Sequence, residues 1–230
     1  MATTMVLDSR FNGPADSANG GYTCGRLAAY LSGPVEVTLR VPPPLGVELQ
    51  VEQEGDCVRL LEGNTLVAEA RPATLELVCP PSPGLARAQE AAKKYVGHDH
   101  HPFPTCFVCG PGRPEHEGLR IFAGPIGGGK VAAPWTPDPG LGRDGFVRPE
   151  FLWCALDCPG AFAVEQSEES PRVLGRLVAS LEQPLPVAQP AVVVGWSLGV
   201  ERRKAFAGTA IYDQAGKLCA RARATWIALQ

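Results

Sequence analysis

The sequence predicts an α+β fold in which a curved antiparallel β-sheet wraps a central helix, twice along the chain. Apolar and polar residues alternate with a period of two at 35–41 and in several later segments, as in half-buried strands. The stretch 151–159 is apolar for most of its length, as in a helix buried within a core. Two similar short segments, 66–71 and 218–223, each close one half of the chain, which indicates an internal repeat.

The composition indicates a globular chain with ample material for a core. Hydrophobic residues make up 45% and charged residues 20% of the 230 residues. The net charge of −3 argues against a protein that binds nucleic acid. No apolar run approaches the roughly 20 residues of a membrane span, and the first residues lack a secretory signal. We therefore expect a cytoplasmic protein without a membrane partner. The eight cysteines, in a chain of this length, are not expected to form a disulfide scaffold.

The first half is expected to form one helix followed by four strands. Apolar residues between Tyr22 and Leu31 keep helical spacing, and Asn19 is a suitable N-cap. Gly20, Gly21 and Gly25 weaken this helix, so close approach by another group explains them better than helix propensity does. The strands are expected at 35–41, 47–51, 56–61 and 65–77, with a turn at 62–64.

A linker is expected between the halves. Residues 80–104 begin with prolines and contain an amphipathic helical stretch at 85–95. We therefore divide the chain into an N-terminal unit at 1–79, this linker, and a C-terminal unit at 105–230. In the C-terminal unit a helix is expected from about Pro149. Strands are expected there at 118–122, 129–135, 173–181, 191–200, 205–212 and 217–229, with a hairpin turn at 213–216.

Three segments carry a resemblance to a known family. They are the F-N-G-x-x-x-x-x-N-G-G-Y-x-x-G segment at 11–25, C-F-V-C-G-P at 106–111, and A-R-A-T-W-I at 222–227. With the order of elements, they make the chain similar to a double hotdog protein of the acyl-CoA thioesterase superfamily. The resemblance implies two tandem hotdog units, hydrolysis of acyl-CoA thioesters, and a homo-oligomer. It implies no cofactor other than the CoA carried by the substrate.

The resemblance also implies a composite site. In the related thioesterases one helix typically begins His-Gly-Gly and carries an Asp about two turns later, and each site takes the helix start from one unit and the acid from the other. Here the first helix keeps Gly20 and Gly21, with Asn19 in place of His and Ala28 in place of the acid. The second keeps Asp157, with 148–150 in place of His-Gly-Gly. One working site and one dead site are expected.

The chemistry of thioester hydrolysis fits this division. Negative charge develops on the carbonyl oxygen, and the unpaired amides at a helix start can receive it; we expect the amides of Gly20, Gly21 and Tyr22 to do so, with Asn19 orienting the thioester. Asp157 would act as general base or as nucleophile. Further residues are expected to contact the substrate or to form turns and core packing, namely Tyr22, Asn12, Trp153 and Cys158.

A metal is not expected, although one alternative stays open. Cys106 and Cys109 form a single CxxC segment near four histidines, His98, His100, His101 and His116, a spacing compatible with zinc. No second CxxC is present, and a redox role is disfavoured because the segment does not open a helix after a strand. Cys154 and Cys158 lie four residues apart and are expected to pack within the core.

Two other functions remain as alternatives to hydrolysis. The chain could be a non-catalytic module that binds acyl-CoA or CoA, because the family's His is missing and Pro159 directly follows Cys158 after the acid. It could also be an enoyl-CoA hydratase or dehydratase of the hotdog type. Such enzymes typically pair an acid with a catalytic His, and neither helix start offers one.

Overall fold

A single large antiparallel sheet runs through the chain in the computed structural model, which describes residues 3–164 and 171–229. Its strands are β1 (Thr3–Val6), β2 (Val35–Leu39), β3 (Glu48–Glu54), β4 (Cys57–Glu62), β5 (Thr65–Pro72), β6 (Gly124–Gly127), β7 (Lys130–Trp135), β10 (Arg172–Leu181), β11 (Ala191–Glu201), β12 (Lys204–Tyr212) and β13 (Leu218–Ala228). A separate small hairpin pairs β8 (Gly142–Arg143) with β9 (Phe146–Val147).

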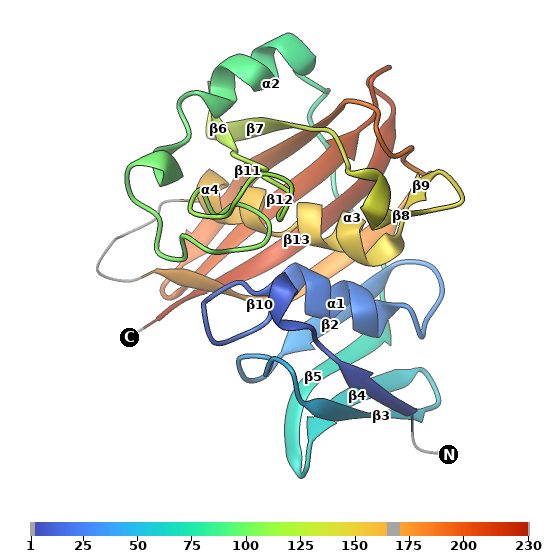
Figure 1. Cartoon of the computed structure of the whole chain (residues 1–230). Coiled ribbons are helices and arrows are strands. Elements are labelled where there is room, and N and C mark those ends of the chain that lie inside the picture. The colour runs from blue at the N-terminus through green and yellow to red at the C-terminus, as the bar shows by residue number, and fades with distance from the viewer. Residues whose placement is uncertain (1–2, 165–170, 230) are drawn as a thin grey trace.

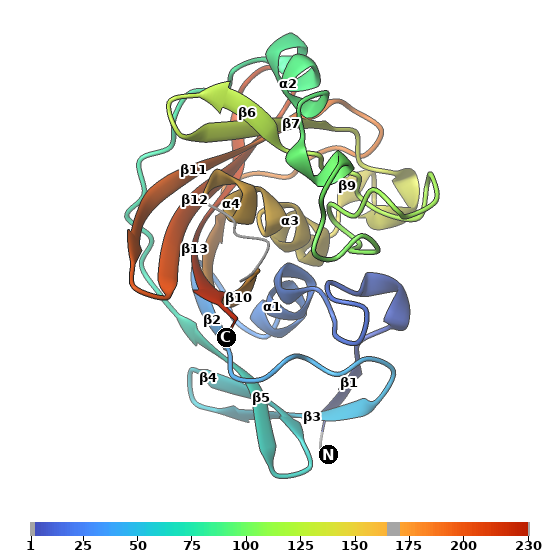
Figure 2. The same ribbon diagram turned by 90° about the vertical axis from the view of Figure 1, so that its left-hand side faces the viewer.

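The helices lie against the sheet at its inner face and at one end. They are α1 (Gly20–Ala28), α2 (Leu85–Ala92), α3 (Pro149–Ala155) and α4 (Cys158–Ala163), with short 3-10 turns at Ser9–Phe11, Val96–His98 and Pro139–Leu141. The sheet curves around α1, α3 and α4, whereas α2 covers β6 and β7 (Figures 1 and 2). The predicted α+β fold with a curved antiparallel sheet is therefore observed. None of the helices in the described residues is long and apolar enough to cross a membrane.

The strand order has the same pattern in both halves. Along the sheet it is β1-β3-β4-β5-β2, then β10-β13-β12-β11-β7-β6. Apart from the extra strand β6, the second run repeats the first in reverse, with the strand that follows the central helix at the seam. At this seam β2 pairs with β10, and the buried side chains of Val37 and Leu177 stand opposite each other. One face of the seam is thus part of the core, whereas on the other face Arg176 pairs with Glu36 at 3.4 Å and donates to the Thr38 hydroxyl at 3.0 Å.

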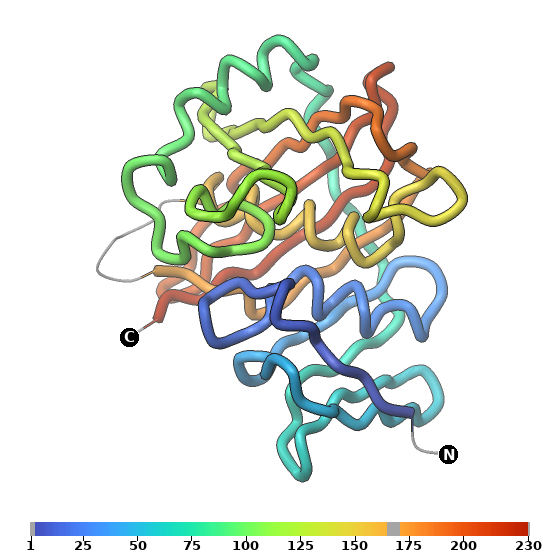
Figure 3. Tube along the Cα trace, in the orientation of Figure 1, coloured from blue at the N-terminus to red at the C-terminus, as the bar shows by residue number. Residues whose placement is uncertain are grey.

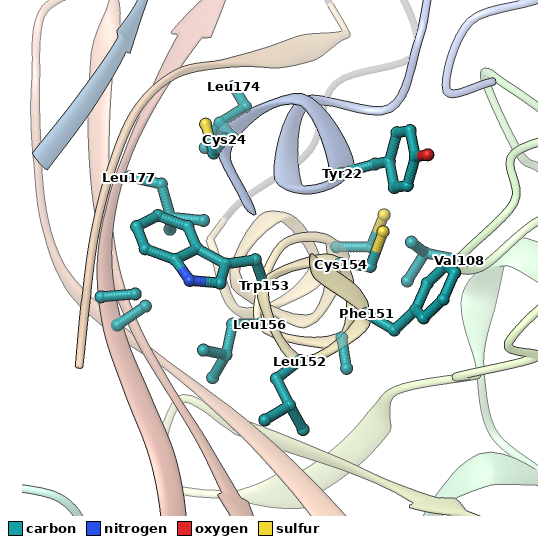
Figure 4. Close-up of a cluster of buried hydrophobic side chains, with 14 of the residues drawn as sticks. Tyr22, Cys24, Val108, Phe151, Leu152, Trp153, Cys154, Leu156, Leu174 and Leu177 are labelled. Atoms are coloured by element: carbon teal, nitrogen blue, oxygen red, sulfur yellow. The ribbon is translucent and has the colours of Figure 1, made fainter. Parts of the chain in front are cut away.

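The centre of the core is the contact between α1 and α3. Trp153 lies on the side of α3 that faces the sheet, beside Leu177, while Phe151 and Cys154 lie on the other side with Tyr22 (Figure 4). All five side chains are at most 4% exposed. Because α3 is apolar nearly all round, it can be buried on every face, as its sequence predicts.

Several element predictions are confirmed and three are corrected. The amphipathic stretch at 85–95 forms α2, and the hairpin turn at 213–216 joins β12 to β13. The predicted strand at 118–122 is wrong, because Arg120 has a positive φ of 53° that breaks extended backbone. The amides of Leu119 and Ile121 there donate to Phe107 and Val108, at 2.8 and 2.9 Å.

The other two corrections concern the edge strand β1 and the central helix. Strand β1 was not expected from its sequence; it is a four-residue edge strand with one buried side chain, Met5. The predicted central helix is broken into α3 and α4 at Asp157, because Pro159 lacks an amide donor and its ring would clash with the carbonyl four residues earlier in a continuous helix. The unit boundaries at 79 and 104 stay a prediction. The stretch 93–123 forms no strand and passes over the helices on the side away from the sheet (Figure 3).

Candidate active site at the junction of the two halves

The carboxyl of Asp157 lies against the start of α1. Its Oδ2 accepts hydrogen bonds from the Gly21 amide and from Nδ2 of Asn19, both at 2.9 Å. Asn19 is the N-cap of α1, and its Oδ1 accepts from the Tyr22 amide at 2.9 Å. The cap therefore uses both ends of one side-chain amide, since its oxygen holds the helix and its nitrogen holds the acid.

Glycine permits this approach. A Cβ added to Gly21 would lie 2.6 Å from the Trp153 carbonyl oxygen and 2.7 Å from the Asp157 Cβ. A Cβ on Gly25 would lie 2.7 Å from the Glu150 Cα. Since real Cβ atoms do not come this close to backbone, only glycines let α1 and α3 pack at this separation. The expectation that close approach explains the glycines is met at Gly21 and Gly25.

Burial dominates the electrostatics of Asp157. The residue is 2% exposed, and its Oδ1 has no hydrogen-bond partner among the described residues. Burial raises the pKa of Asp157 to about 7, although the hydrogen bonds from Gly21 and Asn19 lower it. A buried oxygen without a donor is costly. The site is therefore suited to a water molecule or a substrate group that supplies one.

The break between α3 and α4 lets this carboxyl contact the start of α1. Asp157 has ψ −84°, outside the helical range, and α4 restarts at Cys158. The Thr209 hydroxyl, which is fully buried, donates to the Leu156 carbonyl at 2.7 Å and satisfies one of the carbonyl groups freed by the break. Through this hydrogen bond, strand β12 of the sheet fixes the backbone directly before Asp157.

A cavity of about 1290 Å³ lies beside the carboxyl. Asn19, Gly20 and Asp157 line it from the junction of the two halves. Most of the remaining lining is apolar and includes Leu39, Val41, Phe103, Phe162, Leu174 and Ile227. A volume of this size exceeds the range of about 300–1,000 Å³ of common small-molecule pockets. The arrangement is a mostly apolar cavity with Asn19 and Asp157 at the junction, and with further polar residues in its lining, among them Arg40, Asp99 and Arg172.

The structure brings together some of the predicted site residues and not others. Cys158 lines the cavity together with Asn19, Gly20 and Asp157. Tyr22, Asn12 and Trp153 are not among its lining residues. Tyr22 packs on Phe11, with ring centroids 4.3 Å apart, and Nδ2 of Asn12 donates to the Gly13 carbonyl at 3.1 Å and to the Thr105 hydroxyl at 3.2 Å. Trp153 belongs to the core.

The expected set of oxyanion donors is also changed. The amide of Gly21 donates to Asp157 and the amide of Tyr22 donates to Asn19, so both are already used. The Gly20 amide, at the first position of α1, makes no hydrogen bond to any described residue. Of the three amides, Gly20 alone stays available to a ligand at the helix start.

Sequence reasoning missed a cluster of sulfur atoms on the cavity wall. The Sγ atoms of Cys106, Cys109 and Cys158 all lie within 4.8 Å of one another. Nε2 of His101 lies 3.3 Å from the Cys109 Sγ. All four residues line the cavity. The CxxC segment is a usable signal, but the sequence predicts Cys158 only as a residue that lines the pocket or packs in the core, because only the fold shows that α4 meets this segment.

Comparison with solved structures identifies the fold. A tesB protein from Mycobacterium avium subsp. paratuberculosis superposes with a TM-score of 0.65 at 12% identity, covering 100% of this chain and 93% of its own. The chain has the hotdog fold. A protein from Alicyclobacillus acidocaldarius with a hotdog fold and unknown function covers 100% of this chain and 96% of its own, at a TM-score of 0.60 and 10% identity.

A further structure with this hotdog fold comes from Novosphingobium aromaticivorans and is assigned as a thioesterase. It has a TM-score of 0.64 and 12% identity, and covers 99% of this chain and 95% of its own. No family model matches the sequence, and no curated protein matches it. At these identities the similarity establishes the fold and leaves the chemistry to the residues of the site.

Proposed function

We propose that the protein hydrolyses acyl-CoA thioesters at one composite site between two tandem hotdog units. The observation that carries the proposal is the hydrogen bonding of the Asp157 carboxylate by the Gly21 amide and the Asn19 side chain, at the end of an apolar cavity. The acid comes from the second half and the helix start from the first. Structures of similar fold from Novosphingobium aromaticivorans and Thermobifida fusca, which are named as thioesterases, support this assignment.

The groups of the site have distinct roles in this proposal. Oδ2 of Asp157 accepts hydrogen bonds from two donors, whereas Oδ1 accepts none from the described residues. Oδ1 can therefore accept the proton of an attacking water molecule. The water oxygen forms a bond to the acyl carbon, and the Gly20 amide with the positive end of α1 stabilises the charge on the carbonyl oxygen. The C–S bond then breaks, and the proton passes from Asp157 to the CoA thiolate.

A duplication explains why the acid meets this helix start. Gly21 and Glu150 are the second residues of α1 and α3, and Gly25 and Cys154 are the sixth. A Cβ on Gly21 would lie 3.1 Å from the Cys154 Cα, and one on Gly25 would lie 2.7 Å from the Glu150 Cα. In both contacts the second residue of one helix meets the sixth residue of the other. Exchanging the two halves therefore turns one contact into the other, as expected for units related by a two-fold axis.

The proposal is tested by replacing the acid without changing its shape. Asp157→Asn keeps an oxygen for the two donors but cannot accept a proton, so turnover of acyl-CoA esters should fall by about 10²–10⁴-fold. Glu150→Gln is the matched control, because Glu150 is a carboxylate on α3, the helix that ends just before Asp157, and pairs with Arg148 at 3.3 Å, outside the cavity lining. Equal turnover in wild type and Asp157→Asn would exclude the assignment.

The alternative of a non-catalytic acyl-CoA-binding module is favoured by the occupied amides of Gly21 and Tyr22, which leave one free donor at the helix start. It requires binding of CoA esters without hydrolysis of any ester in a panel of acyl chain lengths. A homo-oligomer and the absence of a cofactor beyond CoA are part of the proposal and follow from the resemblance alone.

A further inference from the structure

Three cysteines from two distant segments converge on the cavity wall. Cys106 and Cys109 come from the loop after α2, and Cys158 is the first residue of α4. Their exposed fractions are 3%, 3% and 7%, so the thiols are shielded from bulk solvent. Free cysteines often serve as small apolar side chains in cores. Core packing alone, however, does not require three sulfur atoms within 4.8 Å of one another.

The spacing matches the coordination sphere of a thiolate-bound metal ion. The Sγ atoms of Cys106 and Cys158 are 3.7 Å apart. With Zn–S bonds of about 2.3 Å, two sulfurs of a tetrahedral site lie about 3.8 Å apart. A disulfide would require about 2.05 Å between the sulfurs. The observed separation therefore fits a shared ion better than a bond between two cysteines.

We propose that Cys106, Cys109 and Cys158 bind one Zn²⁺ ion as thiolates, with the fourth position open to the cavity. The described residues supply three ligand atoms to the group, and all three cysteines line the cavity. Three protein ligands with an open position, filled by water, are typical of zinc sites that face a cavity. On binding, each thiol loses its proton to solvent, so three protons are released per ion at most.

His101 completes the site as a hydrogen-bond donor. The Phe103 amide donates to Nδ1 of His101 at 2.9 Å, so the neutral ring carries its proton on Nε2. Nε2 lies 3.3 Å from the Cys109 Sγ and donates to it. A donor of this kind orients a metal-bound thiolate and offsets part of its charge. His101 is therefore a positioning residue for the ion, and the Zn²⁺ ligands are the cysteines.

The ion would tie the loop to the helix that follows the acid. The stretch 93–123 lacks strands, and Cys106 and Cys109 would be joined through the metal to Cys158, next to Asp157. A link of this kind fixes one wall of the cavity in a part of the chain that has no strand or sheet pairing of its own. This proposal does not depend on thioester hydrolysis, since the ligand set stands whatever the cavity binds.

Metal binding by the reduced, full-length chain tests the proposal. Metal-free protein is titrated with Zn²⁺ against a chromophoric chelator, and in parallel with Co²⁺, whose thiolate charge-transfer absorption reports sulfur ligands directly. One equivalent of Zn²⁺ and a Co²⁺–thiolate spectrum are expected. Cys106→Ser, Cys109→Ser and Cys158→Ser should each weaken Zn²⁺ binding by more than about 100-fold, because even the loss of a group that only hydrogen-bonds a metal ligand costs roughly 10–100-fold.

Controls separate this site from other ways of binding zinc. Cys24→Ser removes an equally buried thiol outside the group and should leave Zn²⁺ affinity unchanged. His101→Ala should weaken binding by roughly 10–100-fold, less than loss of a ligand. Folded, reduced wild type that binds no Zn²⁺, a Co²⁺ spectrum without thiolate bands, or a Cys106–Cys158 disulfide in place of the ion would each overturn the proposal. The spectrum of wild type decides even if a variant fails to fold.

Discussion

The contact between α1 and α3 can be tested by adding a single methyl group at Gly21. In Gly21→Ala the new Cβ would stand 2.6 Å from the Trp153 carbonyl oxygen and 2.7 Å from the Asp157 Cβ. The nearest of these atoms is backbone, so a rotamer change cannot relieve the contact. The helices must separate by several tenths of an ångström, and this movement stretches the hydrogen bond from the residue 21 amide to Asp157.

The magnitude follows from three contributions. Overpacking of a core costs about 1–3 kcal/mol, and weakening a hydrogen bond to a charged group costs about 1.5–3 kcal/mol. Alanine regains up to about 1 kcal/mol through its helix propensity. We expect Gly21→Ala to lower the free energy of unfolding by about 2–4 kcal/mol. For a chain of this size the thermal midpoint should fall by about 5–15 °C.

Two neighbouring glycines provide the controls, measured by urea and thermal unfolding at one pH. Gly25→Ala meets the Glu150 Cα at 2.7 Å but removes no hydrogen bond to Asp157, so it should cost less than Gly21→Ala. Gly20→Ala meets the side chains of Leu174 and Leu39, which can move, so its cost should be the smallest. If Gly21→Ala were as stable as wild type, α1 and α3 would not pack as described and the site geometry would be refuted.

Two further predictions concern the acid and its support. Thr209→Val removes the buried donor to the Leu156 carbonyl and should cost about 1–3 kcal/mol of unfolding free energy in urea titrations; Thr209→Ser, which keeps the hydroxyl, should cost less. In metal-free protein, burial raises the pKa of Asp157 to about 7 in the folded state. The protonated carboxyl therefore stabilises the folded state, fully at a pH below the pKa of the unfolded carboxyl. This stabilisation is lost as the pH rises through about 7. Wild type should therefore lose up to about 3 kcal/mol relative to Asp157→Asn between pH 5 and pH 8, and parallel stability profiles of the two proteins would contradict a buried carboxyl.

The strands with alternating residues were predictable because each buries one face, and burial of one face gives apolar residues a period of two along the sequence. Segments such as 35–41 and 205–212 appear in the structure as β2 and β12 with small shifts at their ends. The segment 118–122 also looks like a strand, yet its backbone partners are in the CxxC loop. Its conformation depends on a tertiary contact and on the positive φ of Arg120, neither of which hydrophobic patterning encodes.

The site was predictable only as far as the resemblance reached. Asp157, Asn19 and Gly21 were expected to meet, and the structure brings them within hydrogen-bonding distance. The use of the amides could not be read from the sequence, because either the acid or a ligand can accept from the Gly21 amide. The approach of Cys158 to Cys106 and Cys109 could not be predicted for a similar reason, since the sequence around a buried cysteine looks the same whether the thiol packs or binds a metal ion.

The two helix starts differ in ways that favour a single site per chain. At the start of α1, Asn19 caps the helix and holds the acid. At the start of α3, Arg148 makes no side-chain cap, and Pro149 removes an amide donor. The position that corresponds to Asp157 in the first helix is Ala28, which cannot accept a proton. A carboxylate introduced at Ala28 alone should therefore not create a second site, because the start of α3 lacks the side-chain cap and the amide donor that the start of α1 provides.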